Sequence, residues 1–388
     1  MIQSTKKTAF INRDKELNYL SHWVQKEPEN ILFIFGPKSS GKTTLLMKFI
    51  ENYQDHKNYH IKHFNLRKIL IDSYINFIQA FFAVDYSDSK KSVKQKREYN
   101  VKVFKISKEI QENLENKRID PFYVMEEALT HFVKKGKRPV IIIDELQALE
   151  NIHMNGQREL LQELFNFFVS LTKESHLCHV IITSSDGYFM NKLYNESKLT
   201  KAAAFYEIDY LSENDVKYWL KHLEQESGIN AYQLTDEQID RIWQYLGGSM
   251  FEISYVLGEL IIDASQNRIT DNQLRECLET IVTTNMGKLK FYAGINHQKR
   301  AMFQEIWHIL QEKSVFDMDD LDSLVQKGLY NEDLLTDELN NLVRTNILAF
   351  NPATACFQVQ GNSFYYGLKS YIEFIRQKQN QKGTKNND

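Results

Sequence analysis

The residues best suited to do chemistry lie in the stretch GPKSSGKTT, residues 36–44. This stretch fits G-x-x-x-x-G-K-[ST], a loop whose successive backbone N–H groups surround phosphate groups. Lys42 is expected to neutralise the β- and γ-phosphate oxygens, and the Thr43 hydroxyl to be a ligand of Mg²⁺. The alternative is a plain Gly/Ser turn between a strand and a helix. The predicted nucleotide-binding residues are Gly36, Pro37, Lys38, Ser39, Ser40, Gly41, Lys42, Thr43 and Thr44.

A pair of acids, Asp144 and Glu145, follows the apolar run Val140–Ile143. Asp144 is expected to hold Mg²⁺ directly or through water. Glu145 is positioned to orient or deprotonate an attacking water, so the pair favours hydrolysis of ATP over its storage. Two acids after a strand are also an ordinary helix-start signal, which is the alternative interpretation. We therefore predict Glu145 and Lys42 as catalytic residues, and Thr43 and Asp144 as the magnesium ligands.

Three hydroxyl side chains, Thr183, Ser184 and Ser185, end the apolar stretch HVIITSS. We expect this strand to lie in the sheet between the strand before the Gly-rich loop and the strand before Asp144. Additional-strand P-loop ATPases place a polar group there to sense the γ-phosphate. Hydroxyls at strand ends are also common turn formers. Which of the three would sense phosphate is left open.

The elements that must position these residues alternate between strands and helices. Continuous apolar runs predict buried strands, and helical spacing follows the first of them from Thr44. Such alternation implies a parallel sheet with right-handed crossovers, and hence a three-layer α/β domain over residues 1–211. The predicted strands are 31–35, 59–66, 140–143, 179–185 and 204–211, and the predicted helices include 69–84, 121–135 and 157–175.

A polar insertion at about 85–118 interrupts this pattern. Residues 90–108 hold eight Lys or Arg against the single acid Glu98. A solvated loop with an exposed helix face explains this charge, and a patch for nucleic acid or phosphate is the alternative.

Helices dominate after Leu211. Ser212, with Asp215 three residues later, predicts a capped helix, and three more helices near 236–245, 249–264 and 271–284 complete a helical lid over 212–296. Helices at 299–312, 319–327 and 332–344, followed by two short strands, predict a winged helix over 297–375. The polar tail 376–388 is expected to be disordered.

Composition narrows the class of protein. The 388 residues suggest two or three domains, and the net charge of −3 provides no overall field that would attract nucleic acid or anionic lipid. Cys178, Cys277 and Cys356 are widely spaced, which a reducing compartment permits, and we interpret them as buried small hydrophobes. With no apolar signal core at the N-terminus and no run long enough to span a bilayer, we expect a cytoplasmic protein.

The order and spacing of FINRDKELNYL, GPKSSGKTTL, IIIDELQAL, IITSS, LSENDVKYWL and LGGSMFEISYVL resemble the archaeal-type ATPase family, among the AAA+-like STAND ATPases. The resemblance covers most of residues 9–375. It implies ATP or ADP bound with Mg²⁺ between the core and the lid. It also implies that Ile11 and Arg13 border the base and ribose, with Asn12 where the family usually has glycine. Lys198 and Lys201 stand where relatives tend to carry an arginine, which argues against a ring motor.

The predicted winged helix is poorly suited to DNA. Its third helix, 332–344, carries Glu332, Asp333, Asp337 and Glu338 against Arg344, and acids facing a polyanion would cost affinity. We therefore predict a slow Mg²⁺-dependent ATPase acting as a regulatory switch, whose winged helix contacts a protein partner or clamps the core. A DNA-binding ATPase resembling origin-recognition proteins, and a scaffold with ATP as a structural cofactor, are the alternatives.

Overall fold

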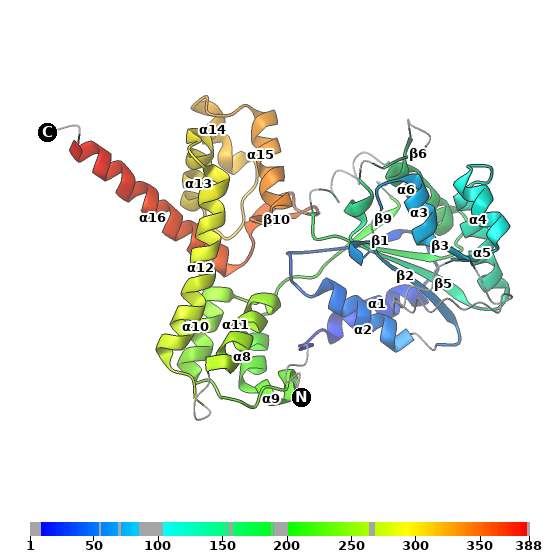
Figure 1. Ribbon diagram of the computed structural model, residues 1–388, viewed down its shortest axis with the longest axis horizontal. Helices are drawn as coiled ribbons and strands as arrows, with labels where there is room; N and C mark the ends of the chain where they lie inside the picture. The colour runs from blue at the N-terminus through cyan, green and yellow to red at the C-terminus, as the bar shows by residue number, and fades with distance from the viewer. Residues whose placement is uncertain are drawn as a thin grey trace.

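Figure 1 shows the computed structural model of the chain, with an α/β part on one side and a column of helices on the other. The structure describes residues 9–53, 56–68, 71–84, 104–150, 152–154, 158–187, 189, 201–263 and 268–385. Most of the predicted basic insertion lies outside the described residues, as does Lys198.

A five-stranded parallel sheet forms the centre of the α/β part, in the order β2-β5-β8-β1-β9. Strand β8 lies between the strand before the Gly-rich loop and the strand before Asp144, as predicted for the hydroxyl-bearing strand. The carboxyl ends of these strands meet at one edge, where α/β sheets bind ligands. The strands are β1 Ile31–Phe35, β2 Tyr59–Asn65, β5 Arg138–Asp144, β8 His179–Thr183 and β9 Ala203–Glu207.

Helices cover both faces of the sheet (Figure 1). Along β1, Leu32 and Ile34 pack with α1 and α2, while Ile31 and Phe33 face the core shared with α3, α5 and α6. This alternation explains why the strand is apolar throughout, and it confirms the predicted α/β class. The helices are α1 Asp14–Gln25, α2 Lys42–Tyr53, α3 Tyr74–Phe81, α4 Lys108–Glu115, α5 Pro121–Lys134 and α6 Leu160–Val169, which a π-helical segment, Ser170–Glu174, continues.

The predicted helix over 69–84 is too long at both ends. Helix α3 begins at Tyr74, and β3 (Phe82–Val84) pairs with β4 (Phe104–Ile106) in a small parallel sheet. The reason is packing, because Phe82 and Phe104 are buried with their rings 5.7 Å apart. A second small sheet joins β6 His153–Met154 to β7 Arg158–Glu159.

The helices after the sheet form a separate hydrophobic core. Ser212 and Asp215 make the predicted capping box at the start of α8. The turn at Gly248 touches the end of the α/β part so closely that an added Cβ would lie 2.0 Å from Leu211 O. The helices of this region are α8 Glu213–Lys221, α9 Leu223–Ser227, α10 Asp236–Leu246 and α11 Met250–Asp263.

Helix α12 (Asp271–Ala293) runs past the predicted end at 284 and connects these helices to the C-terminal ones (Figure 1). Another core holds the C-terminal elements together around the β10–β11 hairpin. The assignment of these elements to a winged helix stays a prediction. They are α13 His297–Ile309, α14 Asp322–Gln326, α15 Glu332–Arg344, β10 Leu348–Asn351, β11 Cys356–Val359 and α16 Asn362–Lys385.

Helix α16 corrects the expected disorder of the tail, because residues 376–385 are helical. This stretch is rich in Lys, Gln and Arg, which favour helix, and the helix is already nucleated where it packs along α12. The predicted boundary at 375 therefore falls inside a helix, while those at 211 and 296 stay predictions. Of the cysteines, Cys178 is buried and the other two are only partly so. Within the described residues, no helix is long and apolar enough to cross a membrane.

A buried histidine should make the fold sensitive to acid. His179 on β8 packs against Trp23, and burial, followed by the charge of Arg138, lowers its pKa to about 4. In the unfolded chain this histidine binds a proton near pH 6.5, whereas in the folded chain it does so only near pH 4. The free energy of unfolding therefore falls as the pH drops from about 6.5 to about 4. We expect wild type to lose about 2 kcal/mol of unfolding free energy relative to His179→Phe between about pH 7.5 and about pH 5. Urea unfolding of both proteins at the two pH values measures the difference, and parallel losses would contradict the argument.

Candidate nucleotide site

The Gly-rich loop joins β1 to α2 in a backbone conformation that needs glycine. Gly36 has φ 146°, and a Cβ there would lie 2.1 Å from Ile208 O, so the loop passes directly against the segment after β9. Gly41 has φ 95°, and Ser39 lies in the left-handed region at φ 66°. Such conformations cluster at functional sites. The loop is held in a shape that a chain without these glycines could not adopt.

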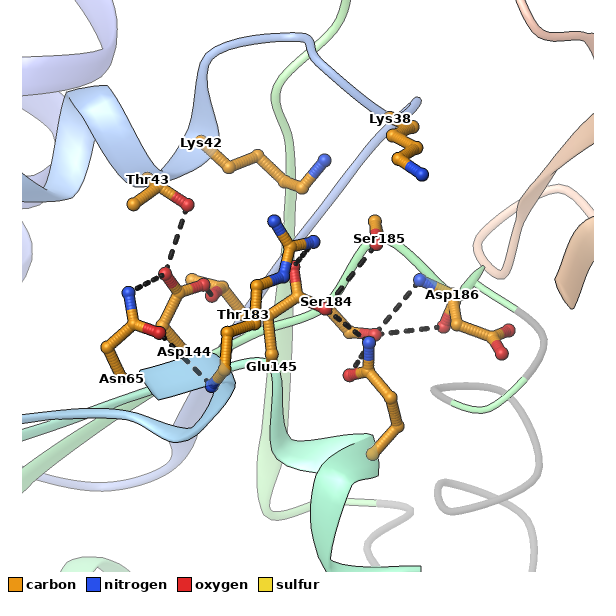
Figure 2. A network of polar contacts seen from close by, with 12 residues as sticks. Lys38, Lys42, Thr43, Asn65, Asp144, Glu145, Thr183, Ser184, Ser185 and Asp186 are labelled. Carbon is orange, nitrogen blue, oxygen red and sulfur yellow. Dashed lines mark hydrogen bonds and ion pairs between the residues drawn. The ribbon is translucent and has the colours of Figure 1, made fainter. Parts of the chain in front are cut away.

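Lys42 begins α2, and its side chain returns over the loop. Its Nζ donates to Gly36 O and Pro37 O at 2.8 Å each and lies 3.4 Å from Ser40 Oγ. Burial lowers the pKa of Lys42 to about 8, while the charges of Glu145 and Asp144 oppose this shift. The ammonium is therefore still mainly protonated at neutral pH. Figure 2 shows Lys42 and Thr43 on one side of the site and the two acids on the other.

Asp144 ends β5 and is buried among polar groups. Thr43 Oγ1 donates to Asp144 Oδ2 at 3.0 Å, Asn65 Nδ2 lies 3.4 Å from the same oxygen, and the Thr183 hydroxyl donates to Oδ1 (Figure 2). One carboxylate beside one hydroxyl is the sparse oxygen set that suits Mg²⁺, which takes its other ligands from phosphates and water. The described residues contain no cluster of three His, Cys, Asp or Glu side chains that could hold a metal alone. Thr43 and Asp144 thus fit the predicted magnesium site.

Glu145, the next residue, sits in a strained conformation with φ 65° and is 5% exposed. Its Oε1 pairs with the Arg67 guanidinium, and its Oε2 accepts from the Gln147 amide and lies 3.5 Å from Ser185 Oγ. Burial raises the pKa of Glu145, while the Arg67 charge lowers it. A positive φ in a residue other than glycine persists only where its surroundings impose it, so the side chain is held in place.

The three candidate sensor hydroxyls contact different partners. The Thr183 hydroxyl is bound to Asp144, and Ser184 Oγ donates to Gln147 Oε1 at 2.9 Å and accepts from the Asp186 N–H at 3.0 Å. Ser185 alone of the three lines the cavity of about 600 Å³ that also holds Lys42 and Glu145 on its walls. The sensing role stays a prediction, and this geometry favours Ser185 for direct contact with a ligand.

A cavity of about 600 Å³ opens between the loop and the lid. Helix α11 contributes two aromatic residues, Phe251 and Tyr255, which are 65% and 46% exposed. The residues that line the cavity are Ala9, Lys38, Ser39, Gly41, Lys42, Thr43, Thr44, Arg67, Glu145, Ser185, Met250, Phe251, Ser254 and Tyr255.

Ile11 and Arg13 do not line this cavity. Ile11 is buried in the core of the lid helices. The Arg13 guanidinium donates to Ser40 O at 2.9 Å and Asp209 O at 2.7 Å, so it ties the Gly-rich loop to the segment after β9. Between them, Asn12 has φ 44°, a conformation that glycine adopts freely and asparagine tolerates. The contact of Ile11 and Arg13 with base and ribose stays a prediction.

The sequence analysis missed three polar residues of the site: Asn65, Arg67 and Gln147. A signal for the first two was available, because Asn65 ends β2 and stands opposite Asp144 in the register of the neighbouring strand. Carboxyl ends of parallel strands share one edge, so polar residues after any strand of this sheet were candidates. The lid residues Phe251 and Tyr255 carried no comparable signal.

The chain is similar to known proteins in sequence and in fold. A family model described as an ATPase domain predominantly from Archaea matches residues 10–256. An uncharacterized ATP-binding protein of Methanocaldococcus jannaschii is 43% identical over 255 residues, which are 65% of this chain and 70% of that protein. A second one from the same organism is 31% identical over 372 residues, covering 94% of this chain and 95% of that protein.

Two solved structures share the fold. The Walker-type ATPase of Pyrococcus abyssi aligns with a TM-score of 0.61 at 16% identity, covering 94% of this chain and 98% of that one. The ORC2 protein of Aeropyrum pernix, solved as ADPNP-ADP complexes, aligns with a TM-score of 0.51 at 10% identity and covers 95% of each chain. At these identities the likeness is one of fold alone.

Proposed function

The chain belongs to the family of ATPase domains found predominantly in Archaea, and from this membership we propose that it hydrolyses ATP slowly to drive a regulatory switch. The membership confirms the predicted family resemblance, and ATP binding agrees with the names of its relatives. In this proposal Lys42 binds the phosphates and Glu145 activates water. Mg²⁺ held by Thr43 and Asp144 would supply positive charge to the phosphate oxygens. An exposed ring of α11, Phe251 or Tyr255, would stack on the base. A cytoplasmic location is part of the proposal.

The proposed switch depends on one contact between the Gly-rich loop and the C-terminal region. The backbone N–H of Lys38, inside the Gly-rich loop, donates to Gln360 Oε1 at 3.0 Å, across 322 positions of the chain. Gln360 is buried, and its Nε2 donates to Leu348 O of the β10–β11 hairpin at 3.0 Å. Tyr210 Oη lies 3.1 Å from Lys38 O and 3.3 Å from Gln360 Oε1. One buried amide therefore joins the phosphate-binding loop to the C-terminal region.

The β10–β11 hairpin also meets the loop after β8 and the end of β9. A Cβ added at Gly187 would lie 1.9 Å from Phe350 O, and Asn351 Nδ2 donates to Glu207 Oε2 at 2.9 Å. The hairpin and Gln360, the residue that follows it, thus contact both loops that would surround a phosphate. If docking of the hairpin and nucleotide binding favour the same loop geometry, each strengthens the other by the same free energy. This linkage makes the C-terminal region the readout of the switch.

Gln360→Ala should weaken nucleotide binding without touching the cavity. Loss of the amide frees the Lys38 peptide in a loop that already holds Ser39 at positive φ, so the loop is less preorganised. We expect ADP affinity to fall by about fivefold, which corresponds to about 1 kcal/mol for one buried hydrogen bond. Titration calorimetry measures the change. Gln358→Ala, the same substitution two residues earlier on β11, is the control and should bind like wild type.

Limited proteolysis tests the switch itself. In wild type the cleavage rate between α15 and α16 should differ between ADP and a non-hydrolysable ATP analogue, and in Gln360→Ala the difference should shrink. A cleavage rate in wild type that is the same with ADP and with the ATP analogue would refute the switch. Nucleotide retained through gel filtration without phosphate release would instead support the scaffold alternative.

The DNA-binding alternative finds little support in the charges of α15. Glu332, Asp333 and Asp337 are exposed on its surface, where they would repel phosphates. Duplex DNA affinity that falls steeply with added salt would nevertheless favour the alternative, and absence of binding at low salt would refute it.

A further inference from the structure

Arg67 is the arginine that lines two neighbouring cavities at the predicted phosphate site. It lines the 600 Å³ cavity and also a second cavity of about 240 Å³, whose walls include Lys38, Glu145 and Ser185. Its side chain is 54% exposed, whereas that of its partner Glu145 is 7% exposed. The exposed Arg67 guanidinium is thus paired with the buried Glu145 carboxylate.

The backbone of Arg67 is anchored beside the magnesium ligands. Its N–H donates to Asn65 Oδ1 at 3.2 Å, and Asn65 Nδ2 lies 3.4 Å from Asp144 Oδ2. The side chain therefore starts from a fixed point at the carboxyl edge of the sheet. Its length lets it serve either Glu145 or a ligand in the cavity.

Glu145 is restrained as long as the pair is made. Its Oε1 is bound to the Arg67 guanidinium and its Oε2 to the Gln147 amide, so both oxygens already accept charged or polar donors. In Figure 2 Glu145 lies below Lys42, and its carboxylate points toward Ser185. A carboxylate engaged in this way is poorly placed to orient a water molecule.

A terminal phosphate would compete well for Arg67. It carries about two negative charges and three strong acceptor oxygens, against one charge and two oxygens on a carboxylate. The planar guanidinium fork fits phosphate with two parallel hydrogen bonds. Among the described residues that line the larger cavity, Arg67 alone carries a guanidinium.

We propose that Arg67 leaves Glu145 for the γ-phosphate when ATP binds, and so acts as an arginine finger within its own chain. This inference rests on the proposed ATP hydrolysis. Water then attacks the γ-phosphorus and gives a proton to Glu145, the bond from that phosphorus to the bridging oxygen breaks, and its electron pair leaves with ADP. Arg67 balances charge on the transferred group, which leaves as inorganic phosphate. ADP has no γ-phosphate, so with ADP the Arg67–Glu145 pair stays closed.

The test compares Arg67→Ala, Arg67→Lys and wild type as full-length proteins with Mg²⁺. We expect Arg67→Ala to lower kcat about a hundredfold to a thousandfold, the usual loss for one group that stabilises charge in the transition state. Affinity for a non-hydrolysable ATP analogue should fall about tenfold or more while ADP affinity stays within about twofold, because ADP does not engage Arg67. Arg67→Lys should recover part of the analogue affinity but little of kcat, since lysine lacks the fork.

Several outcomes would overturn the proposal. Turnover by Arg67→Ala as fast as wild type or faster would mean that Arg67 only restrains Glu145. Equal losses of ADP and analogue affinity would mean a general effect on the site. The control is Arg344→Gln, because Arg344 borders only the smaller cavity and pairs with Glu150 at 3.6 Å. A change of the analogue-to-ADP ratio in this control as large as in Arg67→Ala would also refute the assignment.

The binding ratio separates this proposal from the function on which it rests. If wild type releases no phosphate from ATP, the proposed hydrolysis fails. Arg67 is then tested only by the ratio of the affinity for the ATP analogue to the affinity for ADP. A fall of this ratio in Arg67→Ala supports a contact with the γ-phosphate, and an unchanged ratio refutes one.

Discussion

Lys42→Ala should lower the affinity for both ATP and ADP by about a hundredfold to a thousandfold, the equivalent of two charge-assisted hydrogen bonds to phosphate. The ammonium is buried in the loop and is positioned by Gly36 O and Pro37 O, so alanine removes a positioned charge from the phosphate-binding loop. Lys38, the nearest other lysine on the cavity wall, is engaged through its backbone by Gln360 and Tyr210. Titration calorimetry with each nucleotide measures the loss.

The control for this experiment lies on the same helix. Lys48 on α2 is 47% exposed and pairs with Glu51 at 3.2 Å, so Lys48→Ala removes an equal charge from the same element without touching the cavity. It should bind nucleotide like wild type. Circular dichroism should show both variants folded, and a folded Lys42→Ala protein that binds ATP normally would refute the assignment of the Gly-rich loop.

The sheet could be predicted because each of its strands carries a local signal. Ile31–Phe35 and Val140–Ile143 are apolar on both faces, since helices cover both sides. The residues that follow them are the ones predicted to hold phosphate, Mg²⁺ and the attacking water. Of the strand order, only the place of β8 between β1 and β5 was predicted, and that followed from where additional-strand P-loop ATPases place a polar group rather than from any pattern of pairing.

Contacts between distant parts of the chain could not be predicted in this way. Arg67 and Gln360 act through partners 78 and 322 positions away, and neither residue stands in a motif. Phe82–Val84 continues an apolar run whose pattern predicts a helix, and only its pairing with Phe104–Ile106 makes it a strand. Composition was misleading for α16, whose polar end is helical.

Glu145→Gln should bind ATP but turn it over about a hundredfold to ten-thousandfold more slowly, the usual loss when a general base is removed. The substitution keeps the size of the side chain and its amide can still contact Gln147 and Ser185, so the affinity for ATP should stay close to that of wild type. Phosphate release under saturating ATP measures turnover. Glu126→Gln, an exposed acid on α5, is the matched control, and equal turnover by Glu145→Gln and wild type would remove Glu145 from its role.

The Glu145→Gln protein also separates the two possible actions of Arg67. The amide cannot form the ion pair, so in this background Arg67 is already free to reach a phosphate. If Arg67 acts only by restraining Glu145, adding Arg67→Ala should leave the affinity for a non-hydrolysable ATP analogue unchanged. If Arg67 contacts the γ-phosphate, the double variant should lose about tenfold or more of that affinity and keep its affinity for ADP. The presence or absence of this loss therefore decides whether the Arg67–Glu145 pair is a fixed ion pair or a pair that the substrate opens.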